Sequence, residues 1–287
     1  MRLKDSPFSK KCSLQIGEKI VDFSTPKIMG VLNMTPDSFF DGGKNSSLET
    51  AVNQAEKMIK EGADFIDIGG YSSRPGANEV SIKEEINRTV PIVKAIHEKF
   101  PQIFISIDTF RKSVAEENLK AGATWVNDIS AGNLDKEMIP WVKANQIPYI
   151  AMHMRGNPKT MQNNCTYSHL TNEVLSELIY SIRELNADHP LILDPGFGFS
   201  KTLDQNYELL DNLELFSKLR QPFLVGVSRK SLIYKVLDGG PQDALNGTSV
   251  LNTVGLMKGA SILRVHDVKE AKECLRLLLK LRDSSLI

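Results

Sequence analysis

The sequence predicts one (β/α)₈ TIM barrel over residues 27–282, preceded by a short N-terminal β-hairpin within residues 1–26. Eight short apolar segments recur along the chain, each apolar on both faces, which is typical of parallel strands covered on both sides. Helical segments separate most of them, and such units pair in parallel through right-handed crossovers. A chain of 287 residues, 41% of them hydrophobic, is long enough to form this barrel as a single domain.

The hairpin comes first in the chain. The segment SLQIGEKIVDFS, ahead of Lys27, predicts two short strands that cap the lower end of the barrel. The barrel strands follow in chain order as KIMGVLN, DFIDIGG, IFISID, TWVNDI, PYIAMHM, LILDPG, PFLVGVS and SILRVHD.

Capping-box spacing marks the starts of two helices. Ser46 with Glu49, and Ser81 with Glu84, have the Ser-x-x-Glu pattern in which each side chain satisfies a backbone N–H of the other. The first helix is therefore expected over residues 46–61.

Glycine and proline predict where helices end or bend. Gly62 and Gly122 stand where helix C-caps are expected. Pro91 predicts a kink or a restart in the second helix, because proline removes a backbone donor. The fifth and eighth helices are expected over residues 171–187 and 268–282.

An open, doubly wound sheet of eight strands would give the same alternation of strands and helices. No glycine-rich dinucleotide fingerprint follows the first strand, and this absence favours the barrel.

Charge and composition exclude several classes of partner. The chain has 35 basic and 35 acidic residues, so it lacks the basic excess typical of nucleic-acid binding. Three widely spaced cysteines indicate a reducing compartment. The polar N-terminus lacks the apolar run of a signal peptide, and no apolar stretch approaches a membrane span. We therefore expect a soluble cytoplasmic protein.

Hydrogen-bond acceptors gather at three strand ends. Active sites of such barrels lie at the C-terminal ends of the strands. Asp108, Asn127 and Asp194 come from three of these ends, and all three can accept hydrogen bonds from N–H donors. They suit a polar ring that carries several N–H groups.

Positive charge gathers at the last two strand ends. Lys230 follows the seventh strand, and Arg264 and His266 alternate with Val265 in the eighth. These strand ends are a frequent phosphate site in this fold. A ring with N–H groups and an attached phosphate would suit both halves.

Simpler interpretations remain open for several of these residues. Asp67 and Asp108 are placed where an aspartate often caps the next helix. Asp194 precedes Pro195-Gly196, which also suits a turn. His153 lies between two methionines and is interpreted as a packed residue.

The strand ends resemble those of dihydropteroate synthases. The matching stretches lie in order along the chain, one for each strand end. They are MGVLNMTPDSFFDGG (29–43), GGYSSRPGA (69–77), SIDTF (106–110), VNDIS (126–130), MHMRGNPKTMQ (152–162), LDPGFGF (193–199), VGVSRKS (225–231) and LRVHDV (263–268).

The resemblance implies a folate-biosynthesis transferase and the target class of the sulfonamides. Such enzymes join 6-hydroxymethyl-7,8-dihydropterin pyrophosphate to p-aminobenzoate, giving 7,8-dihydropteroate and pyrophosphate. The implied mechanism is dissociative: pyrophosphate leaves first, and the arylamine attacks the resulting pterin-methyl cation. The resemblance also implies a homodimer and Mg²⁺ as cofactor.

Residue roles are implied in the same way. Asp108, Asn127, Asp194, Lys230 and Met152 would bind the pterin, and Asp108, Asp194 and Lys230 would be catalytic. Asn33, Arg264 and His266 would bind pyrophosphate, with Asn33 also a ligand of Mg²⁺. Phe39, Ser73, Arg74, Pro75, Phe199 and Ser228 would line the p-aminobenzoate pocket, over which loops 34–44 and 71–79 would close.

The second of these loops departs from the family pattern. The family commonly reads GGESTRPG, whereas this chain has Tyr71 in place of the glutamate and Ser73 in place of the threonine. Two other functions stay open: a folate-binding methyltransferase module that serves a corrinoid partner, and a silent pterin-binding paralogue. The methyltransferase would not need the cationic group at the last strands.

Overall fold

The computed structural model describes residues 13–16, 19–34, 44–72, 79–186 and 188–284. Within these ranges, no helix has both the length and the apolar character required to cross a bilayer.

A parallel sheet of eight strands forms the barrel and confirms the predicted fold. Its order is β8-β7-β6-β5-β4-β3-β10-β9, and each neighbouring pair is parallel. A further parallel bridge between Leu193 and Phe223 joins the two edges, so the open-sheet alternative is wrong. The strands are β3 (Lys27–Asn33), β4 (Phe65–Gly69), β5 (Phe104–Asp108), β6 (Trp125–Asp128), β7 (Tyr149–Met152), β8 (Leu191–Asp194), β9 (Leu224–Val225) and β10 (Ile262–Val265).

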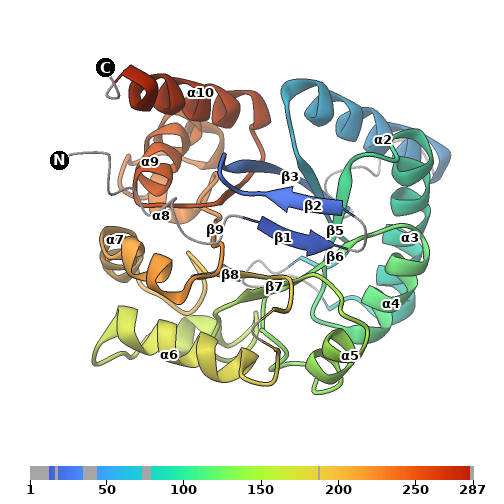
Figure 1. Ribbon diagram of the computed structural model, residues 1–287, viewed down its shortest axis with the longest axis horizontal. Coiled ribbons are helices and arrows are strands. Elements are labelled where there is room, and N and C mark those ends of the chain that lie inside the picture. Colours follow the sequence, from blue (N-terminus) through green and yellow to red (C-terminus); the bar gives the residue numbers. More distant parts are fainter. Residues whose placement is uncertain (1–12, 17–18, 35–43, 73–78, 187, 285–287) are drawn as a thin grey trace.

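Helices surround the sheet as an outer ring (Figure 1). They are α2 (Lys44–Glu61), α3 (Ile82–Lys99), α4 (Lys112–Lys120), α5 (Met138–Ala144), α6 (Leu170–Ile182), α7 (Leu203–Asp211), α8 (Ser231–Tyr234), α9 (Leu245–Met257) and α10 (Val268–Ser284). Short 3₁₀ turns are η3 (Met161–Asn163), η4 (Leu213–Leu219) and η5 (Pro241–Asp243).

The predicted hairpin is present and covers the lower end of the barrel. It pairs β1 (Ser13–Ile16) with β2 (Lys19–Asp22) in antiparallel fashion. Leu14, Val21 and Phe23 belong to one buried cluster with side chains from the lower part of the barrel, including Phe65 and Trp125. Figure 1 shows the hairpin lying across the centre of the ring of helices.

Helix ends agree only in part with the sequence prediction. The Ser81 hydroxyl accepts from the Glu84 amide at 3.1 Å, as a cap should, but the Glu84 carboxylate accepts from Arg88 instead. Helix α2 begins at Lys44, so Ser46 lies inside its first turn and is not the cap. Gly62 and Gly122 have φ of +103° and +115°, a conformation that favours glycine at a helix end.

Two helix predictions need correction. A kink or a restart was predicted at Pro91. Helix α3 continues through it as one element, so the restart is wrong. Helix α6 ends at Ile182, earlier than expected. The α-helix α10 covers the predicted last helix and extends to Ser284.

Alternation along the strands places the polar groups inside the barrel. In β4, Phe65 packs in the lower interior cluster while Ile66 and Ile68 belong to the core beneath the helices. Because side chains alternate with a period of two, Asp67 and Gly69 face the interior with Phe65. The same alternation runs from Trp125 to Asn127, so the interior is apolar below and polar at its upper end.

Candidate active site

An arginine from the last strand lies at the centre of the polar cluster, with 20% of its side chain exposed. Arg264 donates from Nε to Asp67 Oδ2 at 2.6 Å and from Nη2 to Asp108 Oδ2 at 2.7 Å. Burial alone would lower the pKa of Arg264, but these two carboxylates outweigh it and hold the pKa above its usual value. Arg264 is therefore a permanent cation between two acids.

Asp67 is a central member of this cluster, and its interpretation as a helix cap is wrong. It is fully buried, and its Oδ2 also accepts from Asn127 Nδ2 at 3.0 Å. Its Oδ1 has no hydrogen-bond partner among the described residues. The period of two in FIDIG could have predicted that Asp67 faces the barrel interior, since it places Asp67 on the same face of the strand as Phe65.

Asp108 also faces inward and caps no helix. Helix α4 begins after Arg111, and its first amide, that of Lys112, donates to Asp135 Oδ2 at 2.8 Å and not to Asp108. Burial raises the pKa of Asp108 to about 7, although Arg264 opposes the shift and Asp67 adds to it. Removal from water disfavours the charged carboxylate, and this cost is only partly offset by the arginine.

Asp194 makes the predicted turn contact and also lies at the end of a barrel strand. Its Oδ1 accepts from the Gly196 amide at 2.8 Å, which is the predicted turn contact. The side chain is buried at the end of β8, opposite Met152 of β7. Burial raises its pKa, while the positive charge of Lys230 opposes the shift. The carboxylate therefore organises the following turn and faces the polar interior.

Lys230 reaches back over the turn that follows Asp194. Its Nζ donates to the Phe197 carbonyl at 2.6 Å and lies 4.9 Å from the centre of the Phe199 ring. Burial lowers the pKa of Lys230 to about 8, against the stabilising effect of Asp194. The ammonium is thus held between a carbonyl, an aromatic face and a carboxylate.

Asn33 lies at the top of β3 and close to Asp108. A Cβ built on Gly69 would lie 3.6 Å from both Asn33 Oδ1 and Asp108 Oδ2. Glycine at this position therefore leaves room in the mouth of the barrel beside the two oxygens. Among the described residues, no group of three acidic, histidine or cysteine side chains is placed to hold a metal.

Ser228 and His266 lie against each other, although the sequence prediction assigned them to different substrates. The His266 Nδ1 atom is 3.1 Å from Ser228 Oγ, and the His266 amide donates to the same oxygen at 3.1 Å. The neighbouring Arg229 turns away and forms a two-point ion pair with Asp267. Arg229 therefore fixes the loop after β9 rather than the interior.

An apolar wall borders the polar cluster. Met152 is buried with Ile129, Met154 and Met161, and Phe199 packs against this group. Flat apolar and thioether surfaces of this kind suit an aromatic ring.

Four predicted residues, Phe39, Ser73, Arg74 and Pro75, lie outside the described residues. The unusual Tyr71 is described. Its ring meets the Phe110 ring edge-on at 5.2 Å, and the Arg111 guanidinium lies 5.2 Å from the centre of each ring. Arg111 also pairs with the buried Glu85 at 2.8 Å. In this chain an aromatic contact with Arg111 stands where the family pattern has a carboxylate.

Lys201 is a buried cation that the sequence did not reveal. It follows the turn after β8, and its Nζ lies 3.0 Å from His153 Nδ1. His153 is packed, as predicted, and its Nε2 lies 3.0 Å from Glu177. Burial lowers the pKa of His153 to about 4 and that of Lys201 to about 7. No local pattern distinguishes Lys201 from a surface lysine.

Comparisons with known proteins agree with this arrangement. The pterin binding enzyme family matches residues 29–266. Dihydropteroate synthase of Escherichia coli (strain K12) is 44% identical over 262 residues, covering 90% of this chain and 92% of its own.

Solved structures agree as well. Yersinia pestis dihydropteroate synthase with a sulfonamide drug complex has a TM-score of 0.86 at 38% identity, covering 95% of this chain and 99% of its own. The Xanthomonas albilineans enzyme in complex with 7,8-dihydropteroate has a TM-score of 0.83 at 30% identity, covering 94% and 98%. This chain therefore belongs to the dihydropteroate synthase family of pterin-binding enzymes.

Proposed function

We infer that this chain is a dihydropteroate synthase, which condenses 6-hydroxymethyl-7,8-dihydropterin pyrophosphate with p-aminobenzoate to give 7,8-dihydropteroate and pyrophosphate. The observation that carries the inference is the polar cluster at the strand ends, where the acceptor oxygens of Asp108, Asn127 and Asp194 lie with the cations of Arg264 and Lys230. The acceptors of this cluster match a ring rich in N–H donors, and its cations match an anionic leaving group.

The proposed pterin pocket uses oxygen acceptors on three sides. The amino and ring N–H groups of the pterin donate to Asp108, Asn127 and Asp194. Because Asn127 already directs its amide nitrogen to Asp67, its amide oxygen is the acceptor offered to the ligand. Met152 supplies the apolar face against which the ring packs.

The proposed pyrophosphate site lies toward Asn33, Arg264 and His266. Mg²⁺ favours oxygen donors and phosphate, and it usually keeps several of its water ligands. The residues present suit a Mg²⁺ ion of this kind, which would take most of its other ligands from the substrate. Asn33 would be its protein ligand, and when bound the ion would neutralise charge on the departing pyrophosphate.

The arrangement suits a dissociative reaction. Loss of pyrophosphate leaves positive charge on the pterin-methyl group, and the carboxylates of Asp108 and Asp194 stabilise it. Fixed charges in a water-poor interior stabilise such a transition state more strongly than they would in water. Lys230 then borders both substrates, with the Phe199 ring and Ser228 on the p-aminobenzoate side.

A direct assay tests this function. Purified protein with Mg²⁺ and both substrates should release pyrophosphate and form 7,8-dihydropteroate in equal amounts. Asp194→Asn should lower kcat/KM by about 10²-fold or more, since it removes a charge aimed at the cation. Asp211→Asn, at an exposed carboxylate on α7, is the matched control and should leave turnover unchanged. Absence of pyrophosphate release that depends on p-aminobenzoate would refute the assignment.

We further propose a homodimer that uses one side of the barrel. Val250 and Met257 on α9, and Leu277 and Leu281 on α10, are each more than half exposed. These two helices lie side by side in the ring (Figure 1). Large apolar side chains exposed together mark protein interfaces.

The proposed setting is the cytoplasm, which the free thiols of Cys165 and Cys274 support.

A further inference from the structure

The turn between β8 and α7 carries three groups of the proposed site. Asp194 begins it, the Phe197 carbonyl accepts from Lys230, and the Phe199 ring lies beneath the same ammonium. Gly196, Gly198 and Ser200 all have positive φ, of +72°, +82° and +46°. Positive φ is unfavourable for a serine, so the surroundings must hold this turn in place.

Lys201 fixes the turn through hydrogen bonds to its backbone. Its side chain is buried, and its Nζ donates to the carbonyls of Gly196 and Phe199, each at 3.0 Å. The third neighbour is His153 Nδ1, also at 3.0 Å. An ammonium has three N–H donors and no acceptor, so these three contacts use all of them. One carbonyl comes just before Phe197 and the other belongs to Phe199, and these are the two residues that contact Lys230.

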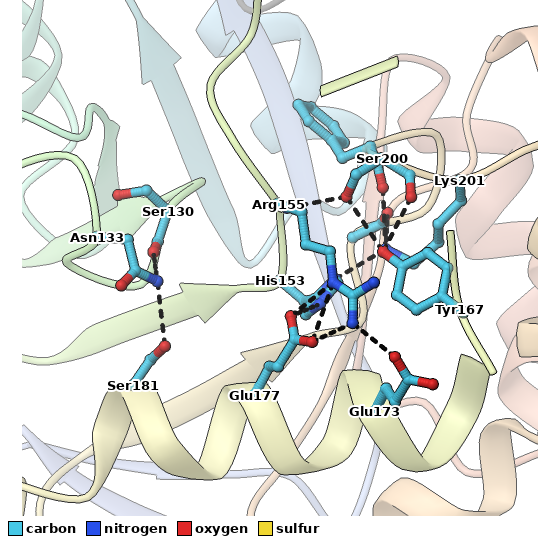
Figure 2. A network of polar contacts seen from close by, with 12 residues as sticks. Ser130, Asn133, His153, Arg155, Tyr167, Glu173, Glu177, Ser181, Ser200 and Lys201 are labelled. Atoms are coloured by element: carbon cyan, nitrogen blue, oxygen red, sulfur yellow. Dashed lines mark hydrogen bonds and ion pairs between the residues drawn. The ribbon is translucent and has the colours of Figure 1, made fainter. Parts of the chain in front are cut away.

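The partner of His153 on α6 fixes its tautomer. The pKa of Glu177 is lowered to about 2, and its carboxylate can only accept, so Nε2 carries the hydrogen and Nδ1 accepts from Lys201. That N–H then donates to Glu177 Oε2 on α6 at 3.0 Å. Figure 2 shows the chain of contacts from Lys201 through His153 to Glu177, which in turn pairs with Arg155.

The same group of residues holds the turn at Ser200. The Arg155 amide donates to Ser200 Oγ, and the Tyr167 hydroxyl donates to the Ser200 carbonyl, both at 2.9 Å (Figure 2). The Arg155 guanidinium lies 3.9 Å from the centre of the Tyr167 ring. Helix α6 is thus linked to the turn by two routes. The route through Arg155 ends at Ser200, whereas the route through Lys201 reaches the carbonyls of Gly196 and Phe199.

We propose that Lys201 is a positioning residue, which clamps the β8–α7 turn so that the Phe197 carbonyl and the Phe199 ring hold the Lys230 ammonium at the p-aminobenzoate side of the site. The proposal deepens the proposed function and rests on it. Of the three pterin acceptors, Asp108 and Asn127 come from β5 and β6, which the clamp does not touch, and Asp194 is held in β8 by its pairing with β7. Loss of the clamp should therefore affect the second substrate more than the first.

The test is Lys201→Met, which keeps the length of the side chain and removes its donors. We expect the KM for p-aminobenzoate to rise about tenfold or more, because small displacements of positioning groups are costly. The Kd for the pterin pyrophosphate, measured by calorimetry, should rise by a smaller factor, because Lys230 borders both substrates while the pterin keeps its acceptors on the barrel strands. Lys201→Ala with added propylammonium should recover part of the loss, which a general packing defect would not allow.

The matched control is Lys258→Met. Lys258 also donates to three oxygens, but these belong to Asp211 and Glu214, away from the turn. Should Lys201→Met fail to fold, Lys201→Gln keeps two N–H donors and should show the same selectivity with a smaller rise. Equal losses for both substrates, or unchanged constants for both, would overturn the proposal.

A second readout separates this proposal from the assignment of function. Hydrogen exchange of the peptide that covers residues 195–202 should become faster in Lys201→Met than in the wild type or in Lys258→Met. Unchanged exchange would overturn the clamp even in an active enzyme. Absence of turnover in the wild type would refute the function instead, and the exchange measurement would still decide the clamp.

Discussion

Single residues set the charge of the barrel mouth. Arg264 is held by Asp67 and Asp108 at once, so the cation that was expected to serve the pyrophosphate also organises the pterin side. Its removal would leave the fully buried Asp67 and the largely buried Asp108 without their cation, which is strongly unfavourable.

We therefore predict that Arg264→Ala weakens pterin binding as well as pyrophosphate binding, each by about tenfold or more. Calorimetry with pyrophosphate and with a pterin that lacks it would measure the two effects separately. Arg183→Ala, at an exposed arginine on the surface, serves as the control. Pterin affinity that survives in Arg264→Ala would show that the two halves of the site are independent.

Asp108 gives the enzyme an acid limit. The folded-state pKa is raised to about 7, so the carboxylate gains a proton as pH falls through that value and loses its charge. The charges that face it are Arg264 from β10, Asp67 from β4, Glu85 from α3 and Asp128 from β6. We predict that kcat/KM for the pterin substrate falls below about pH 7.

The pH profile of Asp108→Asn provides the control. The variant should be slow at every pH and should lack the fall near pH 7, because an amide does not titrate in this range. If the fall persists unchanged in Asp108→Asn, another group is responsible for it.

For single residues, the sequence predicted the position correctly where the alternation of side chains along a strand applied. Arg264, Asp108 and Asn127 were placed correctly at the strand ends, since each follows or ends an apolar run. Asp67 was misread because its position also suited a helix cap. Lys201 was missed because its burial depends on the path of the turn and on His153, which is far away in the chain.

Among the elements, the turn after β8 is closely constrained by its backbone geometry. Gly196 has a φ of +72°, and a Cβ at this position would lie 2.0 Å from the His153 carbonyl oxygen. Only a residue without a Cβ fits there. The turn therefore depends on glycine at one end and on Lys201 at the other.

We predict that Gly196→Ala lowers the free energy of unfolding by about 2 kcal/mol or more, from backbone strain and the clash. Denaturant unfolding measures it. Gly226→Ala is the control, because its φ is not positive and its nearest neighbour would be 3.7 Å away. Equal stability in the two variants would contradict this account of the turn.

Helix boundaries were harder to predict than helix positions. Ser81 caps α3 as its spacing indicated, whereas the same spacing at Ser46 falls inside α2. Short-range patterns allow several starts, and packing against the barrel selects among them. Pro91 is tolerated within α3, where a restart was expected.

For the whole molecule, the order of strands and helices could be predicted almost completely, because eight buried strands leave a periodic signal. Barrel closure could not be read from local sequence, since it rests on the pairing of β8 with the start of β9. The exposed apolar side chains of α9 and α10 became visible only when the helices were placed together.

We predict that the wild type is a dimer and that Leu277→Glu makes it a monomer, because Leu277 is 73% exposed on the proposed interface and a charge there would be desolvated. Sedimentation velocity measures both states. Ile179→Glu, on α6, removes a comparably apolar surface residue and should leave the dimer intact. A monomeric wild type, or a dimeric Leu277→Glu, would contradict the proposed surface.

The most direct test of the account is a crystal structure with the pterin pyrophosphate bound. We predict that the ring N–H groups lie within hydrogen-bonding distance of Asp108, Asn127 and Asp194, with the pyrophosphate toward Arg264 and His266. A pterin bound outside the strand ends, or with its pyrophosphate directed away from Arg264, would contradict it.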